Sequence, residues 1–494
     1  MKKHERGIAL ALSVLCSLLV LTIASTSSPM YATNFWTDSN LYFTIGRGML
    51  KGLMPYRDLF DHKGPLIFML YALGAGISDT SFLGVFLLEA LSLALMLFLA
   101  QQTVALYGRG PLTLLSIPLT AIVTVCSVAF NQGGSAEEFC LCALSLALYA
   151  ALRRMKEGVN CAHPFLPDAA FGAAMGWVFA IKYTDCGLFF GLGAAVLVHI
   201  LCVNGLRQAL YAALRMMLGM TAVLLPICLV LAAKGVLDDM IDVYFIQNIF
   251  GYGEASMSMK AHLYNAAAYL RTQSAANPVM AGLAIAGCAF AALHALLQRR
   301  NGMLAEAMAV PVSAGLLLLF CYWGEMAHPY YALVFASLTP LGLIPLALMA
   351  NRAGARLSYT LCATAVLAAV PLCLQYCAAT PLAQVKRADM AQTVFAEIMN
   401  RESEPTLLDL TSLDQGFYLA AGITPSCRYF ANNNLNTREK REALNSYLAE
   451  GRTEYVVSRW EDPGENYELI AEHESPFDLN DMRLYKLYRR IGRE

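Results

Sequence analysis

Residues 81–106 read SFLGVFLLEALSLALMLFLAQQTVAL, an apolar run with one charged residue, Glu89. A helix needs about 20 apolar residues to cross the hydrocarbon core of a bilayer. Comparable stretches recur along the 494-residue chain. We predict membrane spans near residues 8–25, 81–106, 111–129, 136–152, 168–185, 187–204, 209–234, 277–298, 303–323, 329–350 and 356–378. The predicted fold is an all-α polytopic membrane protein with about 11 transmembrane helices.

The composition supports this class, because 57% of the residues are hydrophobic and only 14% are charged. A soluble protein carries about 25% charged residues. The deficit excludes an ordinary cytosolic enzyme, a disordered scaffold and a nucleic-acid binder with a basic face. Residues 381–494 nevertheless hold 14 of the 35 Lys/Arg and 19 of the 36 Asp/Glu. We therefore expect a membrane domain over residues 1–380 and a soluble domain over 381–494.

Basic residues in short loops predict the orientation, because such loops stay in the cytoplasm. Eleven spans put the N-terminus and five basic loops inside, and leave three large features outside: loop 26–80, loop 235–276 and the C-terminal domain. The apolar stretch 64–77 is too short for a span, so we interpret it as an interfacial or re-entrant helix. An uncleaved first span is preferred over a signal peptide because many apolar segments follow it. The basic loops contain Arg109, Arg153-Arg154-Lys156, Arg207, Arg299-Arg300 and Arg352/Arg356.

The C-terminal domain shows both helical and strand patterns. Helices are predicted over residues 389–400 and 437–451, and strands over 405–411, 453–459 and 482–488. This mixture indicates a small extracytoplasmic α/β domain. It has one cysteine, Cys427, so disulfides cannot staple it. Most of the other cysteines lie in apolar runs, and neither Cys-x-x-Cys nor His-x-x-x-His occurs, so we predict no structural zinc.

The first outer loop concentrates charged groups beside the bilayer. Asp38 precedes an apolar-periodic stretch, so it is interpreted either as a helix N-cap or as a general base for an acceptor hydroxyl. Lys63 precedes the apolar stretch 64–77 and is either an interfacial anchor or a contact to a lipid phosphate. Arg57 is a candidate second phosphate contact, with an ion pair to Asp58 or Asp61 as the alternative.

Further candidates fall on the same predicted outer face. Glu137 and Glu138 begin a span, where they either favour the helix N-terminus or present a carboxylate to the protein interior. Lys182 follows the fifth span and can pair with Asp185. His328 stands in the segment Glu325–Tyr331 and is either structural or part of the site. The convergence of these groups on one face favours a common site.

The first outer loop also has a characteristic order of residues: Thr37-Asp38, Tyr42, Gly46-Arg47, Pro55-Tyr56-Arg57-Asp58, Phe60-Asp61-His62-Lys63-Gly64-Pro65-Leu66. With this pattern the chain resembles bacterial membrane glycosyltransferases of the GT-C fold. The resemblance is strongest to relatives of glycosyltransferase family 39, which include protein O-mannosyltransferases and the aminoarabinose transferase acting on lipid A. It covers roughly residues 8–350 and extends to three later segments: 133–139, Lys182 and His328-Pro329-Tyr330-Tyr331.

The resemblance implies transfer of a hexose or pentose from a polyprenyl-phosphate donor to a cell-envelope acceptor, on the outer face of the cell membrane and with inversion. Asp38 matches the position of the family's catalytic acid, and Lys63 that of its phosphate contact. The family has a Lys-Pro-Pro-Leu-like step where this chain has Lys63-Gly64-Pro65-Leu66. Its frequent Asp-Glu pair is Asp38-Ser39 here, so Glu137 or Glu138 would supply a second carboxylate. The remaining substrate-binding candidates are Arg57, Tyr42, His62, Lys182, His328 and Tyr331.

No cofactor is indicated by the residues, although some relatives bind a divalent metal near the acid. Two other functions are alternatives to the transferase. A transporter or flippase of a lipid-linked substrate should show internal repeats and ionisable groups within its spans. A sensor or assembly protein would depend on its C-terminal domain. We find no repeat, and the candidate groups gather at one surface, which favours the enzyme.

Overall fold

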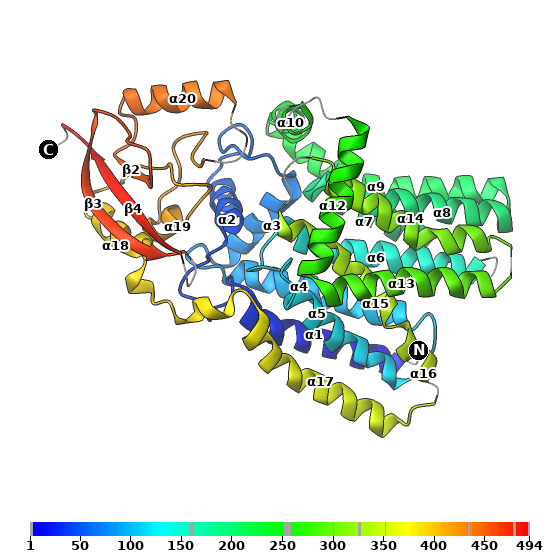
Figure 1. Cartoon of the computed structure of the whole chain (residues 1–494). Helices are drawn as coiled ribbons and strands as arrows, with labels where there is room; N and C mark the ends of the chain where they lie inside the picture. Colours follow the sequence, from blue (N-terminus) through cyan, green and yellow to red (C-terminus); the bar gives the residue numbers. More distant parts are fainter. Residues whose placement is uncertain are drawn as a thin grey trace.

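The computed structural model describes residues 3–158, 163–250, 258–299, 301–324, 328–350, 352–432, 435, 437–477 and 481–492 (Figure 1). Its α-helices are α1 (Lys3–Ala24), α2 (Thr37–Leu50), α3 (Pro65–Ile77), α4 (Leu83–Val104), α5 (Ser116–Val125), α6 (Ala136–Glu157), α7 (Phe165–Ile181), α8 (Gly187–Asn204), α9 (Leu206–Ala233), α10 (Leu237–Ile241), α11 (Asn248–Phe250), α12 (Met259–Ala276), α13 (Pro278–Leu297), α14 (Met303–Cys321), α15 (Thr339–Gly342), α16 (Ile344–Ala350), α17 (Ala355–Tyr376), α18 (Ala391–Met399), α19 (Phe417–Ala421) and α20 (Arg438–Ala449). The strands are β1 (Leu407–Asp409), β2 (Tyr455–Ser458), β3 (Tyr467–Pro476) and β4 (Met482–Arg490).

The chain is a multi-pass membrane protein. Among the described residues, 8 helices are long and apolar enough to cross a membrane, judged by length and composition. Three other predicted spans fall on Pro111–Val125, on α6 and on α7. Two of these helices are short, and α6 carries acids in its first turn and bases in its last. The long helices run side by side on one side of the molecule (Figure 1).

The stretch predicted to be an interfacial helix is α3, a helix of 13 residues. It packs against α2, and a Cβ on Gly46 would lie 2.6 Å from the backbone nitrogen of Ala72. Such a close approach needs glycine, because any side chain there would push the two helices apart. The first outer loop is therefore a packed pair of helices.

The C-terminal region forms a four-stranded sheet in the order β1-β2-β4-β3. Strands β1 and β2 are parallel, and the other neighbours are antiparallel. The predicted helices and strands of this region are confirmed. Strand β3 was missed because the edge strand YELIAEHESP is rich in charged side chains, most of which point to solvent. The predicted division at residue 380 stays a prediction.

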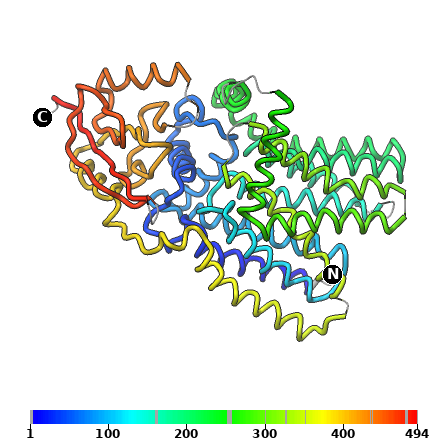
Figure 2. Tube along the Cα trace, viewed as in Figure 1, coloured from blue at the N-terminus to red at the C-terminus, as the bar shows by residue number. Residues whose placement is uncertain are grey.

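The C-terminal region lies directly on the first outer loop (Figure 2). Thr44 Oγ1 on α2 donates to Asp414 Oδ2 at 2.6 Å. The backbone N–H of Phe60 donates to the carbonyl of Arg428 at 2.8 Å, and Arg428 Nε donates to the carbonyl of Tyr56 at 3.1 Å. The sheet region thus braces the segment that carries Asp38 and Lys63.

Candidate active site

The backbone next to Lys63 contacts the membrane helix α7 at the following residue, Gly64. The Gly64 N–H donates to the carbonyl of Ile181 at 3.0 Å, at the end of α7. A Cβ on Gly64 would lie 2.2 Å from the carbonyl oxygen of Ala180, so only glycine permits this contact. A proline at this position, as in the family pattern, would also lack the donated hydrogen. The departure from that pattern therefore seats the loop on α7.

A cavity of about 550 Å³ opens beside this contact. Its polar wall carries His62, Lys63, Lys182 and Tyr331 from three separate segments of the chain. Its remaining wall is largely apolar and consists of Ile181, Tyr183, Thr184, Tyr244, Asn248, Ile249, Phe320, Cys321, Trp323 and Gly324. A cavity lined by two cations and by a largely apolar surface fits an amphipathic ligand.

Lys182 is the centre of a buried charge cluster. Its Nζ forms a short ion pair with Glu137 and lies 3.9 Å from Asp185 Oδ1. The same Nζ lies 3.6 Å from the ring centroid of Tyr331. The pair with Asp185 that the sequence suggests is present, but Glu137 is the nearer partner. Lys182 is thus neutralised and held in place by groups from α6 and the start of the next span.

Asp38 lies in the first turn of α2 and is half-buried. Its interpretation as the N-cap is wrong, because Trp36 holds that position and Asp38 Oδ2 instead accepts a hydrogen bond from Tyr330 at 3.3 Å. Burial raises the pKa of the Asp38 carboxyl, and nearby Lys63 only partly offsets this. A raised pKa makes the carboxylate a stronger base.

Lys63 and Asp38 interact electrostatically although they are 25 residues apart in the sequence. Burial alone would lower the pKa of Lys63, but Tyr331 and Asp38 raise the pKa by more than burial lowers it, so the ammonium stays charged. Asp38 does not line the cavity. It is connected to the polar wall through Tyr330, whose ring packs edge-on against Tyr331 at 5.0 Å between centroids.

Two histidines flank the polar wall. The ring of His328 stacks on Tyr330 at 5.2 Å. Burial lowers the pKa of His328, and Lys63 and Lys182 lower it further, so the ring is neutral near pH 7. His62 Nδ1 lies 3.4 Å from Asp61 Oδ1.

Tyr42 stands one turn after Asp38 and is buried. Its ring packs edge-on against Phe68 at 6.1 Å and Tyr71 at 5.4 Å. Burial raises the pKa of Tyr42, and Asp38 adds to this. Tyr42 therefore packs α2 against α3 and does not line the cavity.

Two further predicted site residues, Arg57 and Glu138, also lie outside the lining of the cavity. Arg57 forms a forked ion pair with Asp58 at 2.9 and 3.0 Å, and its side chain is 45% exposed. The ion-pair interpretation of Arg57 therefore fits, and the phosphate contact does not. Glu138 Oε2 accepts from the Gly134 N–H at 2.8 Å, and Ser135 Oγ caps the helix by accepting from the Glu138 N–H. Glu138 thus fixes the start of α6, whereas Glu137 faces Lys182.

The structure adds residues that the sequence did not single out. Asn248 Nδ2 donates to the carbonyl of His62 at 2.7 Å, and Tyr244 OH donates to the carbonyl of Phe179 at 2.7 Å. Both come from the predicted second outer loop, near the π-helix Asp242–Gln247. Residues 251–257 of that loop, and Glu325–Ala327 of another candidate segment, lie outside the described residues. No sequence pattern marked Tyr244 or Asn248, and Tyr330 appeared only within the segment His328-Pro329-Tyr330-Tyr331, without a role of its own.

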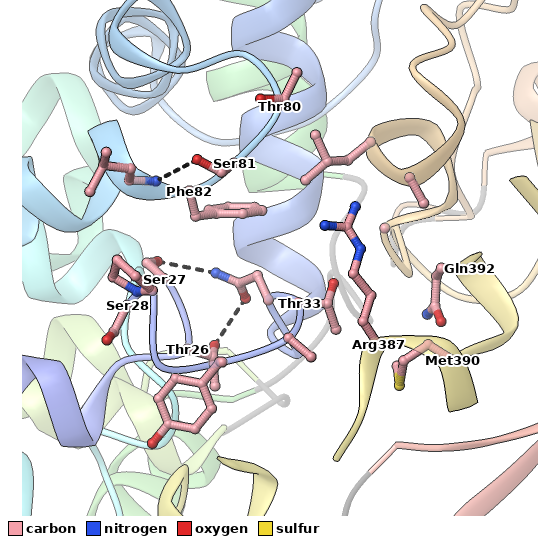
Figure 3. A pocket seen from close by; sticks show the side chains of 18 of the residues that line it. Thr26, Ser27, Ser28, Thr33, Thr80, Ser81, Phe82, Arg387, Met390 and Gln392 are labelled. Atoms are coloured by element: carbon pink, nitrogen blue, oxygen red, sulfur yellow. Dashed lines mark hydrogen bonds between the residues drawn. The ribbon is translucent and has the colours of Figure 1, made fainter. Parts of the chain in front are cut away.

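A second cavity, of about 330 Å³, lies between the first outer loop and the C-terminal region (Figure 3). Hydroxyl groups dominate it, and Asn34 joins two of them by accepting from Thr26 Oγ1 and donating to Ser27 Oγ, each at 3.1 Å. Arg387 points into the space between the two regions (Figure 3). No predicted site residue lines this cavity.

The metal that some relatives bind does not fit here. Within the described part of the chain, Asp38 belongs to no group of three or more clustered His, Cys, Asp or Glu ligands. Charges from Lys63, Asp61, Glu137 and His62 act on Asp38, and Glu137 is already paired with Lys182.

The fold matches solved structures over nearly the whole chain. ArnT from Cupriavidus metallidurans bound to undecaprenyl phosphate has 13% identity and a TM-score of 0.58, with 99% of this chain and 98% of that chain covered. The same protein in its apo state has 12% identity and a TM-score of 0.61, with the same coverage. No family model and no curated protein matches the sequence. The predicted GT-C fold is confirmed.

Proposed function

We propose that this membrane protein transfers a sugar from a polyprenyl-phosphate donor to an acceptor on the outer face of the cell membrane. The observation that carries the proposal is the cavity that Lys63, Lys182 and a largely apolar set of side chains line together, near the half-buried Asp38. ArnT, which shares the fold, has been solved with undecaprenyl phosphate. The proposed orientation has the N-terminus in the cytoplasm.

Lys63 is the proposed contact to the donor phosphate. Lys182 is already neutralised by Glu137 and Asp185, whereas Lys63 has no ion-pair partner among the described residues. An ammonium without an ion-pair partner in the lining of a largely apolar cavity attracts a phosphate, and the lipid chain of that phosphate can lie against the apolar lining. The same charge stabilises the phosphate as it leaves, because negative charge develops on its bridging oxygen. Lys182, held by its acidic partners, contacts the ring of Tyr331 and helps to fix its position.

Asp38 is the proposed general base. An acceptor hydroxyl gives its proton to the Asp38 carboxylate while its oxygen attacks the anomeric carbon. The bond from that carbon to the phosphate oxygen breaks on the opposite side, and polyprenyl phosphate leaves. The configuration inverts because attack and departure take place on opposite faces. Tyr330 orients the carboxylate by its hydrogen bond to Oδ2, and Glu137 holds Lys182 and needs no role as a second base.

Lipid binding tests the role of Lys63. The purified protein would be titrated with undecaprenyl phosphate and followed by native mass spectrometry. A hydrogen bond to a charged group contributes about 1.5–3 kcal/mol, so Lys63→Ala should weaken binding about 10- to 100-fold. The matched control is Lys51→Ala, because Lys51 lies in the same loop but is exposed and bonds to Thr424. Wild-type affinity in Lys63→Ala would refute the phosphate contact.

Product formation tests the base. Membranes with and without the protein would be compared by the mass of their glycosylated products. Asp38→Asn should abolish transfer and leave undecaprenyl phosphate binding within about twofold, since it removes the proton acceptor and preserves the shape. Normal turnover by Asp38→Asn would rule out the assignment. Translocation of the lipid without any new product would favour the transporter alternative.

A further inference from the structure

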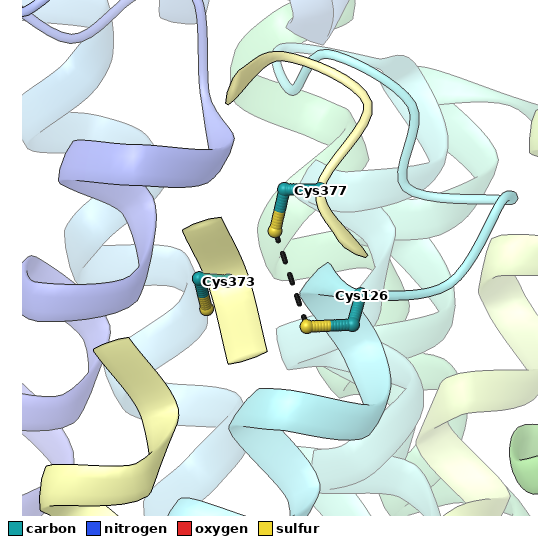
Figure 4. Close-up of side chains that lie close together, drawn as sticks. All are labelled: Cys126, Cys373 and Cys377. Carbon is teal, nitrogen blue, oxygen red and sulfur yellow. Dashed lines mark hydrogen bonds between the residues drawn. The ribbon is translucent and has the colours of Figure 1, made fainter. Parts of the chain in front are cut away.

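Three thiols from two distant helices meet near one end of the membrane bundle (Figure 4). Cys126 follows α5, Cys373 lies in the last turn of α17, and Cys377 follows α17. Their Sγ atoms all lie within 4.8 Å of one another, and those of Cys126 and Cys377 are 4.0 Å apart. Cys373 and Cys377 are buried and Cys126 is half-buried.

This spacing is the one that a shared metal ion requires. A zinc–sulfur bond is about 2.3 Å long, so three thiolates around one ion lie roughly 3.7–4.0 Å apart in tetrahedral or trigonal geometry. The Sγ atoms of Cys126 and Cys377 are already at 4.0 Å, and all three lie within 4.8 Å of one another. Sulfur donors alone select soft ions such as Zn²⁺ or Cu⁺ over Mg²⁺ and Ca²⁺.

We propose that Cys126, Cys373 and Cys377 bind one soft, thiolate-seeking metal ion. The ion would have three protein ligands and one position left for water or a second ligand. The site is independent of the proposed glycosyl transfer, because none of the three cysteines lines the cavity of Lys63.

The position of the cluster suggests what the ion does. Helix α17 is the last long apolar helix, and the chain runs from it through residues 380–390 into the sheet region (Figure 1). It packs on α1 and α5, and much of its surface is exposed, with Leu367 at 74%. An ion shared by α5 and the end of α17 would fix the joint from which the C-terminal region is held. Its loss should loosen that region more than the membrane core.

The sequence could not reveal this cluster. Cys373 and Cys377 are four residues apart, which places them on one face of a helix but forms no Cys-x-x-Cys pattern. Cys126 lies 251 positions before Cys377. The expectation of no structural zinc rested on local spacing alone, and the proposal departs from it for that reason.

Cadmium titration tests the site. The full-length protein would be purified anaerobically in detergent, stripped with a chelator and titrated with Cd²⁺, whose thiolate charge-transfer absorption reports binding. We expect one Cd²⁺ per chain. Losing even an outer-shell partner costs about 10- to 100-fold in metal affinity, so Cys126→Ser, Cys373→Ser or Cys377→Ser should each cost at least that much. Cys362→Ser is the matched control, because Cys362 is also buried on α17 but lies outside the cluster.

A second measurement avoids any variant that fails to fold. Cd²⁺ should slow the alkylation of Cys126 in the wild-type protein at least tenfold and leave the exposed Cys202 unchanged. Equal alkylation rates with and without Cd²⁺ would overturn the proposal, as would the same absorption in a variant lacking all three cysteines. A disulfide between Cys126 and Cys377 in membranes quenched with an alkylating agent at lysis would also overturn it, because oxidised thiols cannot bind the ion.

Discussion

Replacing Gly64 by alanine should separate the first outer loop from α7. The added Cβ would lie 2.2 Å from the carbonyl oxygen of Ala180 and 2.8 Å from that of Ile181. Both atoms belong to backbone, so they cannot swing away as a side chain would. Non-bonded contact needs about 1 Å more room, and the loop must move by roughly that amount. The hydrogen bond from the Gly64 N–H to Ile181 would then lengthen or break.

The cost follows from these contacts. Overpacking of a well-packed site costs about 1–3 kcal/mol, and a lost hydrogen bond about 0.5–1.5 kcal/mol, so we expect a loss of about 2–4 kcal/mol. Lys63 is the preceding residue and moves with the loop. A displacement of about 1 Å can cost about 100-fold in catalysis, so transfer should fall by that order.

The assay combines a thermal melt of the detergent-purified protein with the undecaprenyl phosphate titration and product analysis described above. Gly76→Ala is the matched control, because Gly76 lies in α3 and an added Cβ there meets nothing within 4 Å. Alanine should even favour that helix by about 1 kcal/mol. If Gly64→Ala melted, bound the lipid and turned over like the wild type, the inferred seating of Lys63 on α7 would be refuted.

Four further outcomes are expected. Lys182→Met should leave the Glu137 carboxylate buried without its partner and destabilise the protein by about 3–5 kcal/mol, which Glu137→Gln in the same chain should partly restore in a thermal melt. The pH–rate profile of transfer should lose activity on its acid side above the ordinary carboxyl range, because burial raises the pKa of Asp38; a profile flat down to pH 4 would contradict this. Burial, with Asp414 nearby, raises the pKa of Asp409 from 3.8 to about 7. Between these two pH values the folded protein keeps a proton that the unfolded chain has lost, so the contribution of Asp409 to stability is lost as the pH rises from 4 to 7. The melting temperature of Asp409→Asn should therefore fall less from pH 4 to pH 7 than that of the wild type. Arg57→Ala should leave undecaprenyl phosphate affinity within about twofold, because Arg57 is paired with Asp58 outside the cavity. A tenfold loss of affinity would instead support Arg57 as a phosphate contact.

Local patterns in the sequence determined the architecture. Apolar runs predict membrane helices because a lipid environment demands about 20 apolar residues in succession, and the charge-rich tail predicts a soluble region because it cannot enter that environment. The short apolar stretch that became α3 was separated from the predicted spans by its length and by the placement of the basic loops. Most elements of the tail were recognisable by period, but the short helix α19 and the edge strand β3, which carries three glutamates among its ten residues, were not predicted.

The site depended on contacts that no local pattern encodes. The pairing of Lys182 with Glu137, the seat of Gly64 on α7 and the hydrogen bond from Tyr330 to Asp38 each join residues from different helices. The sequence placed these groups on one face of the membrane but could not tell which of them turn inward. It therefore grouped Glu137 with Glu138, although adjacent residues on a helix point about 100° apart, and in the structure Glu137 faces Lys182 while Glu138 turns to Gly134. How the helices pack decides which charged side chains meet, because the packing brings together residues that are far apart in the sequence, such as Asp38 and Tyr330.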